Sequence, residues 1–263
     1  MKSKTYNDIK SIKYLELVKK VQKRYENQKT NGKIILTGLD SRCGGCHEIN
    51  LYTYWQGLGY AEDTPQIKYL LVGQDWGSLN DIGIEFAKRI EKINQNINRH
   101  EPYIVRNSKE NFLTDENLIR LFMQLGYDDN KAIDKQRHKE LFFTNFCLGY
   151  RIEKTSGNMN KKFMEQDKDL FIELCNILEP ENILCLGKLT FQCVYESLTG
   201  EKACKLEGFN GAYNAFIENH IEITAKCGTK DDTKIYPLAH CGGLGTRNRC
   251  FEHQLADWNR IGN

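Results

Sequence analysis

The sequence lacks several features that would point to particular classes of protein. It contains no run of eighteen apolar residues, so no membrane-spanning helix is expected. The polar segment Met1 to Lys10 has no apolar signal region, so we expect a cytoplasmic protein without a membrane partner. The formal net charge is only +2, which neither requires nor excludes nucleic acid. The phosphate-loop motif Gly-x-x-x-x-Gly-Lys-Ser/Thr is absent, which argues against a small-molecule enzyme built on that loop.

The composition that is present is that of an ordinary globular domain. Apolar residues make up 40% of the chain and charged residues 27%, and the length of 263 residues is sufficient for one sizeable core. The ten cysteines would stay mostly reduced in the cytosol. Cys175, Cys185 and Cys193 lie in apolar or helical surroundings typical of core thiols. Only Cys43 and Cys46 have the spacing of metal ligands.

Short apolar runs alternate with helical patterns along the chain. The predicted strands are Lys68–Val72, Leu141–Phe146, Asn182–Leu186 and Lys234–Leu238. The predicted helices are Leu79–Asn94, Asp115–Leu125, Lys161–Leu178, Leu189–Leu198 and about Asn248–Arg260. This alternation predicts an α/β protein with a mostly parallel central sheet covered by helices on both faces, which is a three-layer α/β/α architecture.

Three segments lie outside this alternation. Apolar residues of Ile9–Tyr25 recur on one helical face with lysines opposite, so residues 1–32 are predicted to form an amphipathic helical extension of a main domain spanning residues 33–263. The polar segment Gln95–Glu110 is interpreted as a surface excursion, and Gly208–Asn219 as a hairpin.

Polar side chains follow three of the predicted strands. The first strand leads into Gly73-Gln74-Asp75, the second ends on Asn145, and the last ends on His240. In open α/β sheets, ligands bind in the crevice at the carboxyl ends of the strands. Each residue alone also fits a structural role, as an N-cap aspartate, a turn amide or a satisfied core histidine. The joint pattern favours a ligand site if the strands are parallel neighbours.

Five motifs in order along the chain carry a resemblance to a known family. They are Gly73-Gln74-Asp75-Trp76-Gly77, Asn111-Phe112-Leu113, Thr144-Asn145, Ile183-Leu184-Cys185-Leu186-Gly187 and His240-Cys241-Gly242-Gly243-Leu244. From about Cys43 to the end, the chain resembles the uracil-DNA glycosylase superfamily. Its layout is closest to the thermophile-type family, which carries an iron–sulfur cluster, while its Gly-Gln-Asp is that of the bacterial type.

The resemblance implies a DNA glycosylase, a hydrolase of DNA repair. Such an enzyme cuts the N-glycosidic bond of a flipped uracil or of a modified or damaged pyrimidine, and it leaves an abasic site. Asp75 would position the attacking water and stabilise the cationic sugar, and His240 would donate a hydrogen bond to the departing base. The expected base pocket comprises Gly73, Gln74, Trp76, Gly77, the stacking Phe112 and the base-reading Asn145.

DNA is the partner that the resemblance implies, and the sequence names no protein partner. Leu244 occupies the place of the residue that fills the vacated base stack. Gly243 lets the backbone approach phosphates closely, and Arg247 and Arg249 are expected to bind phosphate. The other interpretation of this segment is a glycine turn followed by the basic first turn of a helix.

Two departures from the family leave the substrate open. Gly77 stands in place of the tyrosine that blocks the methyl group of thymine in the bacterial-type enzyme, and Trp76 stands in place of a proline. The glycine opens that side of the pocket and the tryptophan can close it again. A 5-substituted or damaged pyrimidine is therefore an alternative to uracil.

The chemistry itself requires no cofactor, but the resemblance implies a metal. Cys43 and Cys46 stand where the thermophile-type family has its first two cluster ligands. Cys147 comes two residues too early for the third, and the next cysteine along the chain is Cys175. The alternatives are an iron–sulfur cluster rebuilt with these cysteines, a zinc ion, and a lost cluster.

A second functional hypothesis keeps the fold and discards the catalysis. The protein would then bind or sense nucleic acid or nucleotides with loops that have drifted. Cys241, which replaces the family's proline after His240, and the incomplete cysteine set motivate this hypothesis. DNA binding that weakens with salt and gives no product would support it.

Overall fold

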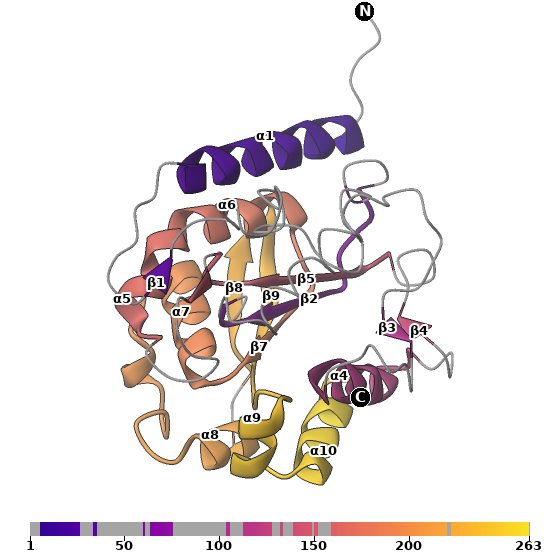
Figure 1. Ribbon diagram of the computed structural model, residues 1–263, viewed down its shortest axis with the longest axis vertical. Coiled ribbons are helices and arrows are strands. Elements are labelled where there is room, and N and C mark those ends of the chain that lie inside the picture. The colour runs from indigo at the N-terminus through magenta and orange to yellow at the C-terminus, as the bar shows by residue number, and fades with distance from the viewer. Residues whose placement is uncertain are drawn as a thin grey trace, which may run out of the picture.

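In the computed structural model, a five-stranded sheet with strand order β5-β2-β7-β9-β8 forms the centre of the molecule (Figure 1). The structure describes residues 6–26, 34–35, 60, 64–75, 104–105, 113–127, 132–133, 139–148, 150–151, 159–219 and 222–262. The strands are β2 (Tyr69–Gly73), β5 (Leu141–Asn145), β7 (Asn182–Leu186), β8 (Thr224–Cys227) and β9 (Lys230–Leu238). Strands β5, β2, β7 and β9 are parallel, and β8 pairs antiparallel with β9. The predicted mostly parallel sheet is confirmed.

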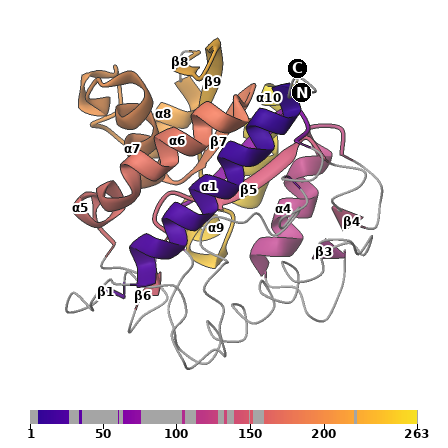
Figure 2. The ribbon, with the colours of Figure 1, turned by 90° about the horizontal axis from the view of Figure 1, so that it is seen from above.

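Helices cover both faces of this sheet (Figures 1 and 2). One face carries α1 (Tyr6–Glu26), α5 (Lys161–Met164), α6 (Lys168–Leu178) and α7 (Lys188–Thr199). The other carries α4 (Leu113–Met123) and α10 (Phe251–Gly262). The shorter elements are α8 (Tyr213–Asn219), α9 (Gly243–Asn248), η2 (Glu165–Asp167), η3 (Ala203–Lys205), β1 (Ile34–Ile35), β3 (Ile104–Val105), β4 (Ala132–Ile133) and β6 (Tyr150–Arg151). None of the helices in the described ranges combines the length and apolar character needed to cross a membrane.

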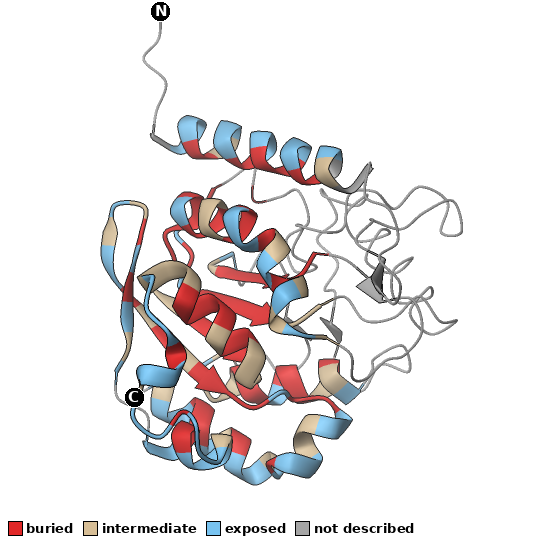
Figure 3. Cartoon of the chain, turned by 90° about the vertical axis from the view of Figure 1, so that its left-hand side faces the viewer, coloured by how far each residue is buried: buried red, intermediate tan, exposed pale blue. Residues whose placement is uncertain are grey.

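The side-chain alternation of the strands divides the core into two halves. Successive residues of a strand point to opposite faces of its sheet. Leu70 and Val72 belong to the core shared with α1, α6 and α7, whereas Tyr69 and Leu71 belong to the core shared with α4 and α10. Every residue of β2 is buried, as expected for a parallel strand that is covered on both faces. Figure 3 shows the buried residues gathered in the strands and on the helix faces turned toward them.

Helix α1 packs against the sheet and against α6 (Figure 2). Its Tyr14 ring lies 6.1 Å from the ring of Phe142 on β5. Its Lys10 Nζ lies 2.6 Å from a carboxylate oxygen of Glu179, the residue that ends α6. Both side chains of this ion pair are buried. The helix therefore shares its core with the residues of the predicted main domain, while the predicted boundary at residue 32 lies outside the described residues.

Two sequence predictions of secondary structure are wrong, and one strand was not predicted. Gly208–Asn219 forms turns followed by α8, not a hairpin, because Phe216 and Ile217 are buried on one side of a helix, with Phe216 against Phe209. The single predicted helix over 161–178 is divided into α5, η2 and α6. The hairpin lies further along, where the unpredicted strand β8 pairs with the first half of β9.

Candidate functional site

The four parallel strands end at one level, and polar residues follow three of them. Gly73 at the end of β2 pairs with Asn145 at the end of β5, and Leu238 of β9 pairs with the last residue of β7. Asp75 and His240 each lie two residues beyond their strands. Strand β7 separates β2 from β9, so these two strands are not direct neighbours as the simplest prediction had it. The Asp75 carboxylate nevertheless acts electrostatically on His240.

Gly73 and Asn145 are in close contact at the strand ends. A Cβ atom at Gly73 would lie 2.1 Å from Oδ1 of Asn145, so the asparagine amide rests directly on the glycine backbone. Two further backbone hydrogen bonds join the strand ends, from Phe146 N–H to Gly73 O at 2.9 Å and from Cys147 N–H to Gln74 O at 3.0 Å. The buried Asn145 amide is therefore held at a defined height above β2.

Asp75 lies half-buried beside the amide of Gln74. The Gln74 side chain donates a hydrogen bond of 2.8 Å from Nε2 to Oδ2 of Asp75. Such a bond orients one carboxylate oxygen. A carboxylate in this place can orient a water molecule and stabilise a nearby positive charge.

The imidazole of His240 is set in one tautomer by its own loop. The backbone N–H of Gly242 donates to Nδ1 at 2.9 Å, so the proton of the neutral ring belongs on Nε2. His240 keeps a large exposed surface. Its partial burial lowers the pKa of His240, and the Asp75 carboxylate opposes the shift by raising it. At neutral pH the ring is a neutral donor through Nε2–H.

The first turn of α4 anchors the loop that follows His240. Asn117 donates from Nδ2 to the carbonyl oxygen of Cys241 at 2.7 Å, and the Cys241 thiol lies 3.9 Å from the carbonyl oxygen of Thr114. Burial raises the pKa of the Cys241 thiol to about 12, so this cysteine is an unreactive core group. A Cβ atom at Gly242 would lie within 3.0 Å of both the Thr114 hydroxyl and the His240 ring. The loop therefore requires glycine beside the imidazole.

The residues expected to face DNA lie on a short helix that follows a glycine turn, as in the second interpretation of this segment. Gly243, Leu244 and Arg247 all belong to α9. Leu244 has an exposed fraction of 60%, and Arg247 is also exposed. The expectation that Arg249 binds phosphate is wrong for this structure, because its guanidinium is buried and paired with Asp257 and Glu218.

Several predicted site residues lie outside the described part of the chain. These are Trp76, Gly77, Phe112, Cys43 and Cys46. The roles expected of them stay predictions.

The described cysteines bear only in part on the expected metal site. Cys147 and Cys175 are both buried in the core that contains α6, and burial and the thiol of Cys227 raise the pKa of Cys175. Within the described residues, no group of three or more His, Cys, Asp or Glu side chains is arranged to hold a metal ion. The metal site stays a prediction, and no step argued below depends on it.

Sequence reasoning missed the buried polar residues behind His240. Gln254 and Asp257 on α10 are both buried, although in the sequence they resemble the polar face of an amphipathic helix. Their partner Arg249 lies outside α10, so no short-range sequence motif predicts their burial. A cluster of three charged groups around Arg249 is visible only once α8 and α10 are placed together.

The fold and the site together define a class of protein. It is an α/β protein whose mostly parallel sheet carries an acid, an amide and a neutral imidazole at the carboxyl ends of its strands, where such sheets bind ligands. In comparisons with known proteins, no family model matches the chain, and no curated protein matches it.

Proposed function

We propose that this protein is a DNA glycosylase with a fold like that of the uracil-DNA glycosylase superfamily. Its substrate would be an extruded uracil or a modified or damaged pyrimidine in DNA, and its product an abasic site. The observation that supports the proposal most strongly is the placement of Asp75, Asn145 and His240 at one edge of the sheet, with the His240 proton on Nε2.

The proposed reaction is hydrolysis of the bond between the sugar C1′ and the base nitrogen. That bond breaks as its electron pair leaves with the base, and the oxygen of a water molecule bonds to C1′. Asp75 orients the water and stabilises the positive charge that grows on the sugar. The proton lost by the water balances the proton that the departing base finally takes up, so one water is consumed for each base released.

Recognition of the base belongs to Asn145 and His240. The Asn145 amide presents one acceptor and one donor side by side, which matches the N3–H and O4 edge of uracil. The Nε2–H of neutral His240 donates to O2, where negative charge develops as the base departs. Gly73 contributes by leaving space for the Asn145 amide.

Helix α9, which follows His240 in the chain, contacts the DNA. Extruding the base from the stack costs a few kcal/mol. The exposed Leu244 fills the gap that the base leaves. Arg247 contacts a phosphate, and such contacts weaken as salt is added.

The direct test measures base release from oligonucleotides that carry uracil or other altered pyrimidines, followed by alkaline cleavage of the abasic strand. We expect Asp75→Asn and His240→Ala each to lower kcat by about 10²–10³-fold, the usual effect of removing one group that stabilises the transition state. The matched controls are Asp231→Asn and His253→Ala, which change exposed residues that have no role in the proposed reaction.

Three outcomes decide the proposal. Cleavage that falls in both site variants and persists in both controls supports it. Full activity in both site variants contradicts the catalytic assignment. Salt-dependent DNA binding with no product from any altered base contradicts the enzyme and supports the binding protein instead.

A further inference from the structure

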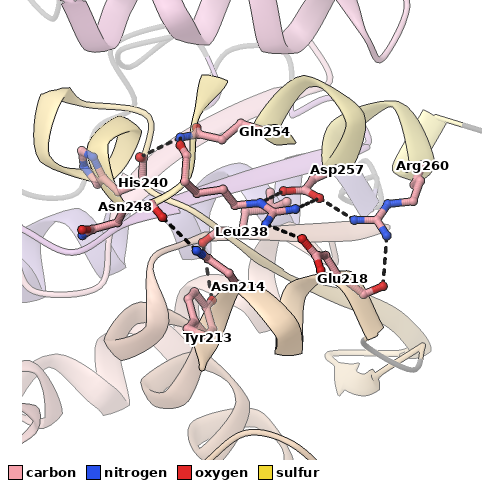
Figure 4. Close-up of polar contacts among 10 residues, drawn as sticks. Tyr213, Asn214, Glu218, Leu238, His240, Asn248, Gln254, Asp257 and Arg260 are labelled. Atoms are coloured by element: carbon pink, nitrogen blue, oxygen red, sulfur yellow. Dashed lines mark hydrogen bonds and ion pairs between the residues drawn. The ribbon is translucent and has the colours of Figure 1, made fainter. Parts of the chain in front are cut away.

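A buried polar cluster lies directly behind His240 (Figure 4). At its centre is Arg249, the residue that follows α9, with an exposed fraction of 4%. Its Nε and Nη2 donate to the two carboxylate oxygens of Asp257 at 2.6 and 2.7 Å, and its Nη1 donates to Glu218 at 2.9 Å. Such a bidentate ion pair fixes the plane of the guanidinium as well as its position.

The cluster joins α8 and α10 to the end of α9. Glu218 belongs to α8, and Asp257 belongs to α10. Arg260 contacts Asp257 and donates to the Glu218 carbonyl oxygen at 3.1 Å. On the α8 side, Asn214 donates to the carbonyl oxygen of Asn248 at 2.8 Å. The carboxyl end of α9 is therefore held from two directions.

The side chain of Gln254 contacts both the backbone of Arg249 and the backbone of His240. The side chain is buried, with an exposed fraction of 1%. Its Nε2 donates to the Arg249 carbonyl oxygen at 2.9 Å and reaches the His240 carbonyl oxygen at 3.5 Å. An amide NH₂ has two hydrogens and both neighbours are pure acceptors, so this orientation of the amide is the one that satisfies them. One side chain thus spans both ends of the segment 240–249.

The His240 carbonyl is confined on its other side as well. A Cβ atom at Gly245 would lie 1.7 Å from the His240 carbonyl oxygen, so the backbone of α9 rests against it. The same segment supplies the Gly242 N–H that holds Nδ1 of the imidazole. The position of the His240 carbonyl and the tautomer of its ring therefore depend on one short stretch of backbone.

We propose that Gln254, bonded to the backbone of Arg249 whose side chain Asp257 fixes, is a positioning residue that sets the orientation and tautomer of the His240 imidazole. The consequence for catalysis rests on the proposed function, whereas the consequence for the ring itself does not. A purely structural role would predict only a loss of stability when Gln254 is replaced.

The test replaces the amide with a side chain of similar size and no donor, Gln254→Met. The matched control is Gln192→Met, which removes a half-buried amide bonded to Glu196 at 3.0 Å on α7. The readouts are ¹H–¹⁵N imidazole spectra over a pH series, kcat and KM on uracil-containing DNA, and the melting temperature. The His240 signals are identified by their disappearance in His240→Ala.

In Gln254→Met we expect the Nδ1–H tautomer to appear and the pKa of His240 to rise. The reason is that the Gly242 N–H bond to Nδ1 stabilises the neutral ring, and a loosened loop weakens it. We expect kcat to fall on the order of 10-fold or more with KM little changed, since a misplacement of ~1 Å can cost ~10²-fold. Gln192→Met should leave the tautomer, the pKa and kcat unchanged.

An unchanged His240 tautomer and pKa in a folded Gln254→Met variant would overturn the proposal. If that variant does not fold, Arg249→Lys tests the same support of the loop. This substitution keeps the positive charge and removes the bidentate pair with Asp257. A folded Arg249→Lys with a wild-type His240 spectrum overturns it equally. If the wild-type protein releases no base, the glycosylase proposal fails, but the imidazole spectra still decide the role of Gln254.

Discussion

Gly73 is a residue whose small size matters to the candidate base pocket. A methyl group at this position would lie 2.1 Å from Oδ1 and 3.3 Å from Cγ of Asn145. We expect Gly73→Ala to displace the Asn145 amide and to destabilise the fold by about 1–3 kcal/mol, as other overpacked sites do. The loss of base release should match that of Asn145→Ala. Urea unfolding and the cleavage assay measure the two effects.

The double variant Gly73→Ala/Asn145→Ala separates this mechanism from general damage. If the added methyl acts only by displacing the amide, the double variant releases base at the rate of Asn145→Ala alone. Additive losses would show that Gly73 acts in some other way. Gly211→Ala, at an exposed turn where a Cβ would lie 3.3 Å from a backbone oxygen, is the control for adding a methyl group.

Residues of the site differ in how visible they are in the sequence. Asp75, Asn145 and His240 could be picked out because each ends or follows an apolar run typical of a buried strand. Gln254 and Asp257 could not, since polar residues on a helix normally mark its solvent face. Both are bonded to Arg249, which lies outside α10, and Arg249 in turn pairs with Glu218 of α8, so no spacing within α10 reveals them.

At the scale of whole elements, a buried ion pair joins α1 to the residue that follows α6. Lys10 and Glu179 are 2.6 Å apart, with side-chain exposed fractions of 10% and 9%. Glu179 also accepts a hydrogen bond of 2.7 Å from the Thr229 N–H in the β8–β9 hairpin. We expect Glu179→Gln to destabilise the protein by about 3–5 kcal/mol, because it leaves the Lys10 charge buried without its partner. Urea unfolding at neutral pH measures this loss.

The matched control is Glu173→Gln on the same pair of helices. Glu173 pairs with Lys20 of α1, but both side chains are more than a third exposed. An exposed pair of this kind contributes about 0–1 kcal/mol. Equal losses in the two variants would contradict the role given to burial. The double variant Lys10→Met/Glu179→Met should recover much of the stability, since an apolar pair can replace a buried ion pair.

Elements with strong internal patterns could be predicted, and elements defined by contact could not. Strands β2, β5 and β7 appear in the sequence as continuous apolar runs, which is typical of parallel strands covered on both faces. Strand β8 has only the four residues Thr224–Cys227, alternately exposed and buried, and it exists because β9 provides an edge. Helix α8 forms because Phe216 meets Phe191 and Phe209, which no local pattern reveals.

At the scale of the whole molecule, stability should fall in acid through groups whose pKa values are lowered by folding. Burial would raise the pKa of Glu196, but hydrogen bonds from Lys161, Gln192 and the Ala203 N–H outweigh it and lower the pKa from 4.5 to about 2. A lowered carboxyl pKa gives stability that is complete above the unfolded value of 4.5 and is lost as the pH falls through about 2. His240 acts in the same direction at higher pH, because its unfolded form takes up a proton first below 6.5.

Replacing Glu196 tests the acid window. The carboxylate joins α5, α7 and the segment at η3 through Lys161 and Ala203, so Glu196→Gln should cost about 1.5–3 kcal/mol at neutral pH, the usual worth of a hydrogen bond to a charged group. The difference from the wild type should shrink as the pH falls below 4.5, because the wild-type carboxyl then loses its charge as well. Urea unfolding over a pH series measures both curves, and Glu222→Gln, in an exposed pair with Lys234, should keep the wild-type slope. A difference that stays constant down to acid pH would mean that the charge of Glu196 contributes nothing and that only its shape matters.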